Sequence, residues 1–320
     1  MSNAAKIWLI IAAVLMLLGG MLFVGGLTMN KWNFAEIGTE TYETNTYEVG
    51  EAFANIAIDV DTTEIAFLPA EGEECKVVCF ENAKIKHSVT VENDTLLIDT
   101  VDTRKWYEHI TFSFQTPKMT VYLPQKEYAS LKIETDTGDI TLPKDFSFET
   151  IQIEGDTSHV HCFASASGTV EVEVSTGTIR AEELTAGELK LSTSTGKINI
   201  KSVKVQKDIA LETDTGRITL DEVPCKDLFA TGNTGSITLK SVVATGRFSI
   251  ENDTGSVVFE YSDASEIFVR TSTGNVTGTL LSEKVFITET STGKVDVPKS
   301  TSGGRCEIVT STGNIRIAVD

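Results

Sequence analysis

Apolar and polar residues alternate along most of the chain, and from residue 131 onward this alternation recurs at a fixed interval. A three-residue mark, Asp, Ser or Asn followed by Thr-Gly, returns every 19 or 20 residues from Asp136-Thr137-Gly138 to Ser311-Thr312-Gly313. One degenerate copy, Asp156-Thr157-Ser158, fills the only gap in the series. Ten copies at so constant a spacing predict a repeat architecture.

Each repeat carries four apolar columns, found by counting from the glycine of the mark. Apolar residues stand seven and five positions before the glycine and two and four after it, as Leu189, Leu191, Ile198 and Ile200 do around Gly196. This period-2 alternation predicts two short β-strands per repeat, joined at the Thr-Gly turn. Glycine closes such a turn because it adopts positive φ at little cost. The predicted turn positions are Gly138, Gly177, Gly196, Gly216, Gly235, Gly255, Gly274, Gly293 and Gly313.

Two architectures fit this pattern. In an antiparallel meander every Thr-Gly would be a hairpin turn, whereas in a β-solenoid equivalent strands stack in parallel about 4.8 Å apart. The solenoid places like residues over like and needs equal repeats, which a meander does not. The sequence therefore predicts an all-β solenoid of about ten coils, two short strands per coil, over residues 129–320. Ten coils would make a rod on the order of 48 Å long; the hand of the coil stays open.

An uncharged apolar run precedes the β-region. Ile7 to Leu27 contains no charge, and as a helix it would span about 31 Å, the thickness of a bilayer core. Trp8 and Trp32 bracket the run where interfacial aromatic residues are found. A cleaved signal peptide is the competing interpretation, but it has a shorter apolar region that ends in a small-x-small site. We therefore predict an uncleaved single-pass anchor in residues 1–30.

Two further segments lie between this run and the repeats. Residues 31–50 are polar and acidic, and we expect a short stalk there. In residues 51–128, runs such as Ile56, Ile58 and Val60 alternate like strands but lack the later period, which predicts an irregular β-region. This region is either the start of the solenoid or a separate cap.

The charge balance excludes one class of partner. The chain has 27 Lys and Arg against 46 Asp and Glu, a net charge of −19, and nucleic-acid binding requires a basic footprint. Eleven carboxylates and no basic residue lie between Lys31 and Lys76. A solvated acidic surface is the main interpretation, with capture of a divalent cation or a cationic ligand as the alternative. The acidic remainder favours a cytoplasmic amino terminus and an extracytoplasmic body at the cell membrane.

The sequence offers no catalytic constellation. Gly-x-Ser-x-Gly, a phosphate-binding loop and His-Glu-x-x-His are all missing from it. We therefore predict a protein that is not an enzyme, without catalytic, cofactor-binding or metal-ligating residues and without a cofactor. His159 and His161 are expected to be a solvated outward pair, and the cysteines in apolar columns, Cys162 and Cys306, to be small core residues. Cys75 and Cys79 lie roughly 13 Å apart along one strand, too far for a mutual disulfide.

Two ligand hypotheses concern the marks themselves. The Asp copies (Asp136, Asp156, Asp214 and Asp253) invite comparison with calcium-binding β-rolls, which use Gly-Gly-x-Gly-x-Asp repeats at half this period. Thr-x-Thr pairs such as Thr193 and Thr195 are reminiscent of ice-binding solenoids, but the inner row is interrupted and has inward parity. A structural role for the marks is favoured over both hypotheses.

The combination of one N-terminal span, an acidic β-region and Thr-Gly-marked coils resembles a bacterial family. This family is the domain of unknown function numbered 4097, labelled adhesins, with relatives among envelope-stress operon proteins. The resemblance covers about residues 50–320 and rests on the recurring Ser/Asp-Thr-Gly-x-Ile/Val pattern. It implies a cell-surface β-repeat protein and provides no functional residues to carry over.

These observations predict a membrane-anchored extracytoplasmic protein that acts by surface interaction, in adhesion, envelope scaffolding or stress sensing. Its expected partners are the membrane, through Ile7 to Leu27, and a surface protein or glycan, and not nucleic acid. A solenoid enzyme or lectin-like binder acting on surface polysaccharide is the alternative. The expected contact surface lies on outward positions between the corners, such as Arg180, Lys190, Arg217, Lys240 and Arg270.

The C-terminal coil raises a separate expectation. Cys306 to Val319 is as apolar as the interior coils, and no polar cap follows it before Asp320. The end of a solenoid needs cover. We therefore expect this coil to pair end to end with a second copy or with a partner chain.

Overall fold

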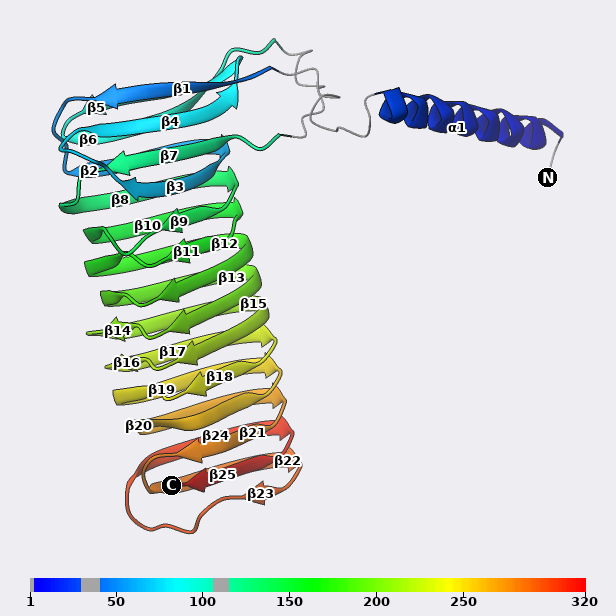
Figure 1. The fold of residues 1–320 in the computed structure, drawn as a ribbon. Helices are drawn as coiled ribbons and strands as arrows, with labels where there is room; N and C mark the ends of the chain where they lie inside the picture. The colour runs from blue at the N-terminus through cyan, green and yellow to red at the C-terminus, as the bar shows by residue number, and fades with distance from the viewer. Residues whose placement is uncertain (1–2, 30–40, 106–114) are drawn as a thin grey trace.

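The computed structural model describes residues 3–29, 41–105 and 115–320, which form one helix and a long stack of β-coils (Figure 1). Helix α1 spans Asn3–Met29, and its segment Trp8–Gly26 is long and apolar enough to cross a membrane. The described strands belong to one continuous 25-stranded sheet. Their bounds, in chain order, are β1 Tyr42–Val49, β2 Asn55–Thr62, β3 Glu64–Pro69, β4 Cys75–Asn82, β5 Ile85–Glu92, β6 Thr95–Asp102, β7 Lys118–Leu123, β8 Glu127–Thr137, β9 Ile140–Leu142, β10 Ser147–Thr157, β11 Val160–Cys162, β12 Ser165–Glu182, β13 Thr185–Lys201, β14 Lys204–Val205, β15 Asp208–Asp221, β16 Pro224–Cys225, β17 Asp227–Thr234, β18 Ile237–Lys240, β19 Val243–Thr254, β20 Val257–Thr273, β21 Val276–Leu280, β22 Lys284–Thr292, β23 Val295–Asp296, β24 Gly304–Thr312 and β25 Ile315–Val319.

Each coil has two long sides, which stack into two faces of the rod. What we call the first sheet contains, in spatial order, β5, β6, β2, β8, β10, β12, β13, β15, β17, β19, β20, β24 and β22. The second sheet contains β1, β4, β7, β3, β9, β11, the distal parts of β12, β13 and β15, then β18, the start of β20, β21, β25 and β23.

Parallel stacking in register confirms the predicted solenoid. Ile198 lies between Ile179 and Ile218, and Gly196 between Gly177 and Gly216. The four apolar columns face inward, because both sheets turn one side toward the core, and they are buried except in the β22–β23 coil, where Val295 is exposed. Burial of each such Leu or Ile contributes about 1.5–3 kcal/mol relative to exposure. All five cysteines, Cys162 and Cys306 among them, are free and buried.

A short third side closes each coil and was not predicted, because its strand segments are only about two residues long. Its inward column begins with the aromatic rings of Tyr128 and Phe148, whose centroids are 5.7 Å apart. Toward the C-terminal coils the column continues with smaller residues. These residues, Ala166, Ala186, Val205, Cys225, Ala244 and Ala264, are buried.

The N-terminal coils are continuous with the repeats. β2 and β3 pair in parallel with β8 and β9, so the irregular region stacks directly on the first Thr-Gly coil. β1, β4 and β5 pair antiparallel and cover this end of the rod. Of the expected stalk at residues 31–50, residues 31–40 lie outside the described part of the chain, and Tyr42–Val49 is strand β1. Its apolar alternation is weak because Tyr47 and Val49 are its only inward apolar residues.

The two C-terminal coils stack in the reverse of their chain order. β24 lies between β20 and β22, and β25 between β21 and β23. The expectation that Cys306–Val319 forms the uncovered end is therefore wrong, since Cys306, Ile308 and Ile315 are fully buried. The described end of the rod is the β22–β23 coil, in which Thr288 stands in an apolar column. Because the β22–β23 coil is the less apolar of the two, leaving it at the end of the rod exposes less apolar surface than leaving the inserted coil there would.

A pair of glycines lets the last coil pass between the β20 and β22 strands. A Cβ on Gly303 would overlap the carbonyl oxygen of Glu283, and one on Gly304 would overlap that of Ser265. The side chain of Lys284 passes over Gly304, and its Nζ lies 2.7 Å from Oδ1 of Asp263, with both side chains largely buried. This ion pair ties the outermost coil to β20 across the inserted coil.

Candidate functional site

The nine glycines of the marks lie at the corner between the first and second sheets. In every case a Cβ would stand closer than 3.0 Å to the carbonyl oxygen of the corner residue in the adjacent coil. Five of these glycines also have φ between 142° and 157°, whereas the other four do not have a positive φ in the left-handed range. Positive φ is thus only part of the reason for glycine. The shared requirement is close approach of backbone to backbone.

Threonines surround this corner on both sides. The threonines of the marks stack in register and are exposed, as Thr176, Thr195 and Thr215 show. The threonines three positions before the glycine point inward, as parity predicts. Oγ1 of Thr310 donates to the carbonyl of Gly274 at 3.2 Å, and Oγ1 of Thr290 donates to that of Gly313 at 2.9 Å. The inner row therefore stabilises the corner and is not a surface for a ligand.

At two corners an irregular residue is accommodated by a glycine that leaves space for its side chain. A Cβ on Gly155 would lie 2.9 Å from Oγ of Ser158, so the missing side chain makes room for the residue that replaces the corner glycine. Likewise a Cβ on Gly232 would lie 2.6 Å from Oδ1 of Asn252. Nδ2 of Asn252 donates to the carbonyls of Gly235 and Gly255, at 3.0 Å each.

The other residues singled out in the sequence do not meet in one place. Arg180, Arg217 and Lys240 lie on the second sheet, whereas Lys190 and Arg270 lie on the first. Among the Asp copies, Asp214 accepts a hydrogen bond from Asn233 (2.8 Å) and Asp253 accepts one from Ser272 (3.3 Å), each in the next coil. These two carboxylates take part in a side-chain ladder. His159 Nδ1 likewise accepts from the backbone N–H of Thr178 at 2.9 Å.

A row of like charges crosses the outer face of the first sheet. Asp99, Asp59, Glu134, Glu154 and Glu173 occupy equivalent outward positions on five neighbouring strands. Neighbouring strands are about 4.8 Å apart. We call these five residues the acidic row.

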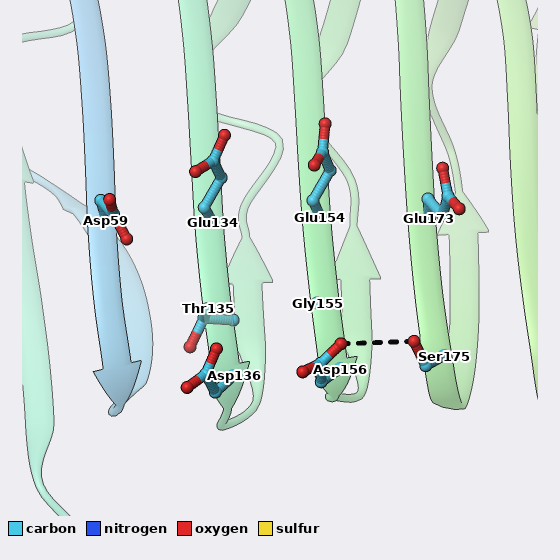
Figure 2. A pocket seen from close by; sticks show the side chains of 9 residues that line it. All are labelled: Asp59, Glu134, Thr135, Asp136, Glu154, Gly155, Asp156, Glu173 and Ser175. Atoms are coloured by element: carbon cyan, nitrogen blue, oxygen red, sulfur yellow. Dashed lines mark hydrogen bonds between the residues drawn. The ribbon is translucent and has the colours of Figure 1, made fainter.

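The acidic row borders a hollow of about 350 Å³ that is open to solvent. Figure 2 shows its glutamates side by side on successive strands, with the aspartates of two marks below them near the corner. There Oγ of Ser175 donates to Oδ1 of Asp156 at 3.3 Å. The lining residues are Asp59, Glu134, Thr135, Asp136, Glu154, Gly155, Asp156, Glu173 and Ser175.

The electrostatics of the acidic row are unfavourable to the fold. Partial burial raises the pKa of Asp59, and the carboxylates of Glu134 and Asp99 raise it further. When the folded-state pKa of a carboxyl group is raised, its ionisation destabilises the folded protein, so Asp59 costs stability at neutral pH. Along the row, like charges directly opposite on neighbouring strands are also destabilising. Lys132 pairs with Glu134, and Gln152 donates to Glu154 at 2.8 Å, which offsets part of this cost.

The second sheet carries a row of the opposite design. Glu182, Lys201, Asp221, Lys240 and Glu260 occupy equivalent positions on five neighbouring strands, so the sign of the charge alternates. Nζ of Lys240 lies 3.2 Å from Oδ2 of Asp221. Opposite charges directly across a sheet are stabilising, and like charges are destabilising. We call this the alternating row.

Two further open hollows lie on the first sheet, beyond the acidic one. One, of about 270 Å³, lies where the small Ala210 neighbours Phe229. The other, of about 200 Å³, includes Phe268 and Arg270. The guanidinium of Arg247 lies 5.2 Å from the ring centroid of Phe229, and that of Arg305 lies 5.5 Å from that of Phe268. The first sheet thus presents a hollowed face that is acidic toward the N-terminal end and aromatic toward the other.

Sequence reasoning missed the acidic row, although part of its signal is present in the repeat. Glu134, Glu154 and Glu173 all stand four positions before the corner residue. Asp59 and Asp99 extend the row, but they lie in the irregular region and have no mark from which to count. Only the pairing of β2 with β6 and β8 places them there.

The fold and this face define a β-solenoid repeat protein. The chain matches the family model described as Toastrack DUF4097 over residues 53–318, and it belongs to that family. None of the curated proteins matches it.

Solved structures resemble it at low identity. A putative adhesin from Parabacteroides merdae has a TM-score of 0.53 and 13% identity, covering 77% of this chain and 98% of its own, which shows a shared fold. A putative lipid binding protein from Parabacteroides distasonis has a TM-score of 0.49 and 15% identity, with 88% and 98% covered. A putative adhesin from Bacteroides fragilis has a TM-score of 0.43 and 15% identity, with 87% and 97% covered.

Proposed function

We propose that this protein is a single-pass membrane protein whose extracytoplasmic solenoid acts by binding a surface partner, without catalysis. The length and apolar character of α1 support the anchor. Membership of the Toastrack DUF4097 family and the description of two structural neighbours as putative adhesins support a surface-interaction role. The hollowed outer face of the first sheet is the proposed contact surface.

The single observation that carries this proposal is the acidic row. A solenoid can neutralise such a row at no cost in backbone geometry, as the alternating row on the second sheet shows. The first sheet instead retains five carboxylates in succession, with a cost to stability. A cationic partner would remove that cost on binding, and complementary charge would steer its approach. We therefore assign to this end of the face a surface protein that presents a strip of Lys or Arg side chains.

Neutralising the two rows separately tests the proposal. The triple variant Glu134→Gln, Glu154→Gln, Glu173→Gln removes charge from the acidic row, and Glu182→Gln, Asp221→Asn, Glu260→Gln removes as many carboxylates from the alternating row. With the full-length protein in nanodiscs, we expect the first variant to bind an oligolysine probe about tenfold more weakly, a loss of about 1.4 kcal/mol. The second should bind like the wild type. Salt should weaken wild-type binding, because exposed charges are screened.

Equal binding by both variants would show that overall charge, and not this face, attracts the probe. Capture of envelope proteins should follow the same order, with the wild type and the alternating-row variant capturing more than the acidic-row variant. If the acidic-row variant captured surface polysaccharide normally and Phe268→Ala did not, the lectin-like alternative would take its place. The aromatic part of the face, with Phe229 and Phe268, gives that alternative its physical basis.

The orientation in the membrane needs its own measurement. All five native cysteines are buried, so labelling of Cys306 would not report topology. Thr254 is exposed on the corner ladder and offers a better position. In intact cells, Thr254→Cys should react with a membrane-impermeant maleimide, and protection until lysis would contradict an extracytoplasmic solenoid.

A further inference from the structure

Three potential metal ligands converge inside the N-terminal cap. Cys79 and Glu81 lie on β4 and His87 on β5, two strands that follow each other through a tight turn. The sulfur, a carboxylate oxygen and an imidazole nitrogen all lie within 4.8 Å of one another, and the three residues are buried. We propose that this cluster is a binding site for a divalent cation of the zinc class.

The surroundings of the cluster resemble the outer shell of a metal site. Oε1 of Glu81 accepts hydrogen bonds from Nδ2 of Asn45 (2.7 Å) and from the hydroxyl of Tyr47 (2.9 Å). Oε2 accepts the backbone N–H of His87 at 2.7 Å and lies 2.6 Å from Nδ1 of the same residue. The other ring nitrogen of His87 lies 3.4 Å from Oγ1 of Thr63. Outer partners of this kind fix the orientation and tautomer of metal ligands.

The donor set selects the class of ion. Sulfur, imidazole nitrogen and carboxylate oxygen are all ligands of Zn²⁺, whereas Ca²⁺ and Mg²⁺ take oxygen ligands. A thiolate and a carboxylate together balance the charge of a divalent ion, which suits a site where Cys79 and Glu81 are fully buried. Cys75, on the same strand, is also buried but is not part of the cluster.

The position of the site indicates what a bound ion would do. β1 and β4, the outermost strands of the second sheet, carry Asn45, Tyr47 and the ligands Cys79 and Glu81, while β5, the outermost strand of the first sheet, carries His87. Thr63 begins the corner stack, since a Cβ on Gly138 would overlap its carbonyl oxygen. An ion here would join the ends of both sheets at the corner and lock the cap onto the rod.

Cobalt spectroscopy tests the ligand set directly. Full-length protein in detergent, reduced and freed of metal with a chelator, should bind one equivalent of Co²⁺ with a thiolate-to-cobalt charge-transfer band. Zn²⁺ should displace the cobalt and raise the melting temperature. Cys79→Ser and His87→Ala should abolish the band, whereas the matched control Cys75→Ser should retain it. Tyr47→Phe should keep the band with about 10–100-fold lower affinity, as for other outer-shell changes.

Circular dichroism of each metal-free variant shows whether it has folded, so that loss of the band is not mistaken for loss of structure. Wild-type protein that shows no cobalt band and no zinc-dependent shift would overturn the proposal, and the cluster would then be a buried Glu81–His87 pair alone. A band that survives in Cys79→Ser, or one that disappears in Cys75→Ser, would also contradict the ligand set.

Discussion

Two of the three corners of a coil place different demands on the chain. At the Thr-Gly corner the backbone of one coil touches that of the next, so there is no space for a side chain. At the second corner, which follows the second sheet, five successive coils place a residue other than glycine in the left-handed region, with φ between 49° and 57°. These residues are Glu183, Ser202, Glu222, Ser241 and Tyr261.

This difference separates two reasons why a position requires glycine, a positive φ and the lack of space for a Cβ. The second corner needs an unusual φ but leaves room for a side chain at the surface, so the chain accepts the conformational cost. The first corner forbids the Cβ by contact, and its glycines are kept even where φ is ordinary. Contact is therefore the stricter requirement, and four substitutions rank the effects.

The largest effect is expected at an interior Thr-Gly corner. In Gly216→Ala the new Cβ would overlap the carbonyl oxygen of Gly196, and the parallel ladders on both sides prevent the coils from separating. We expect a loss of at least about 4 kcal/mol in the free energy of unfolding, measured by denaturant titration. Gly72→Ala, where nothing lies within 4 Å, should change it by less than about 0.5 kcal/mol. A tolerated Gly216→Ala would refute the contact explanation.

A smaller loss is expected from Asn252→Ala. This change leaves the carbonyls of Gly235 and Gly255 without the hydrogen bonds that Nδ2 donates in the interior. Unsatisfied buried acceptors cost about 1–3 kcal/mol each, so we expect a total loss of roughly 2–4 kcal/mol. The exposed Asn233→Ala is the control and should lose much less. Similar losses in the two variants would mean that the inner row does not support the corner.

The degenerate corner permits a double-mutant cycle. Gly155→Thr alone should destabilise the protein by about 1–3 kcal/mol, because its side chain enters the space of Ser158. Adding Ser158→Gly restores the pattern of the other coils and should recover most of that loss, a coupling of about 1–3 kcal/mol. Additive effects of the two changes would show that Gly155 and Ser158 do not compensate each other.

The smallest effect has the opposite sign. Ser241→Gly relieves a left-handed conformation that costs about 1–2 kcal/mol but adds the entropy cost of glycine, about 0.5–1 kcal/mol. We therefore expect a net gain of about 0.5 kcal/mol, visible as a small rise in melting temperature. Ser256→Gly, at a position without positive φ, should instead lose about 0.5–1 kcal/mol. A loss at Ser241 would indicate that the second corner is not strained.

The same contrast explains what the sequence could predict. The solenoid and its first corner could be predicted because close contact requires glycine at nine of the ten marks, and this requirement recurs with the period. The second corner left no such trace, since its residues vary between Glu, Ser and Tyr and none of these types is enriched at positive φ. The third side was hidden because its strands are too short to show alternation.

Two other features depend on pairings between distant segments. The alternation of apolar and polar residues does not show in which order coils stack. Phe286 and Cys306 occupy equivalent positions in the last two coils, so the pattern permits either stacking order. Only Thr288 and the Gly303-Gly304 pair mark the observed order. The Cys79, Glu81 and His87 cluster likewise requires the antiparallel cap, which lies outside the repeat.

The inserted C-terminal coil has a consequence for biosynthesis. Residues 304–320 are synthesised after residues 284–296, yet their strands lie inside the rod, between coils made earlier. A nascent chain that ends before them could stack β22 directly on β20 at the ordinary 19-residue step. This part of the rod therefore cannot be completed until residues 304–320 have been synthesised. A chain that includes these residues acquires an order of coils that a chain truncated before residue 304 cannot form.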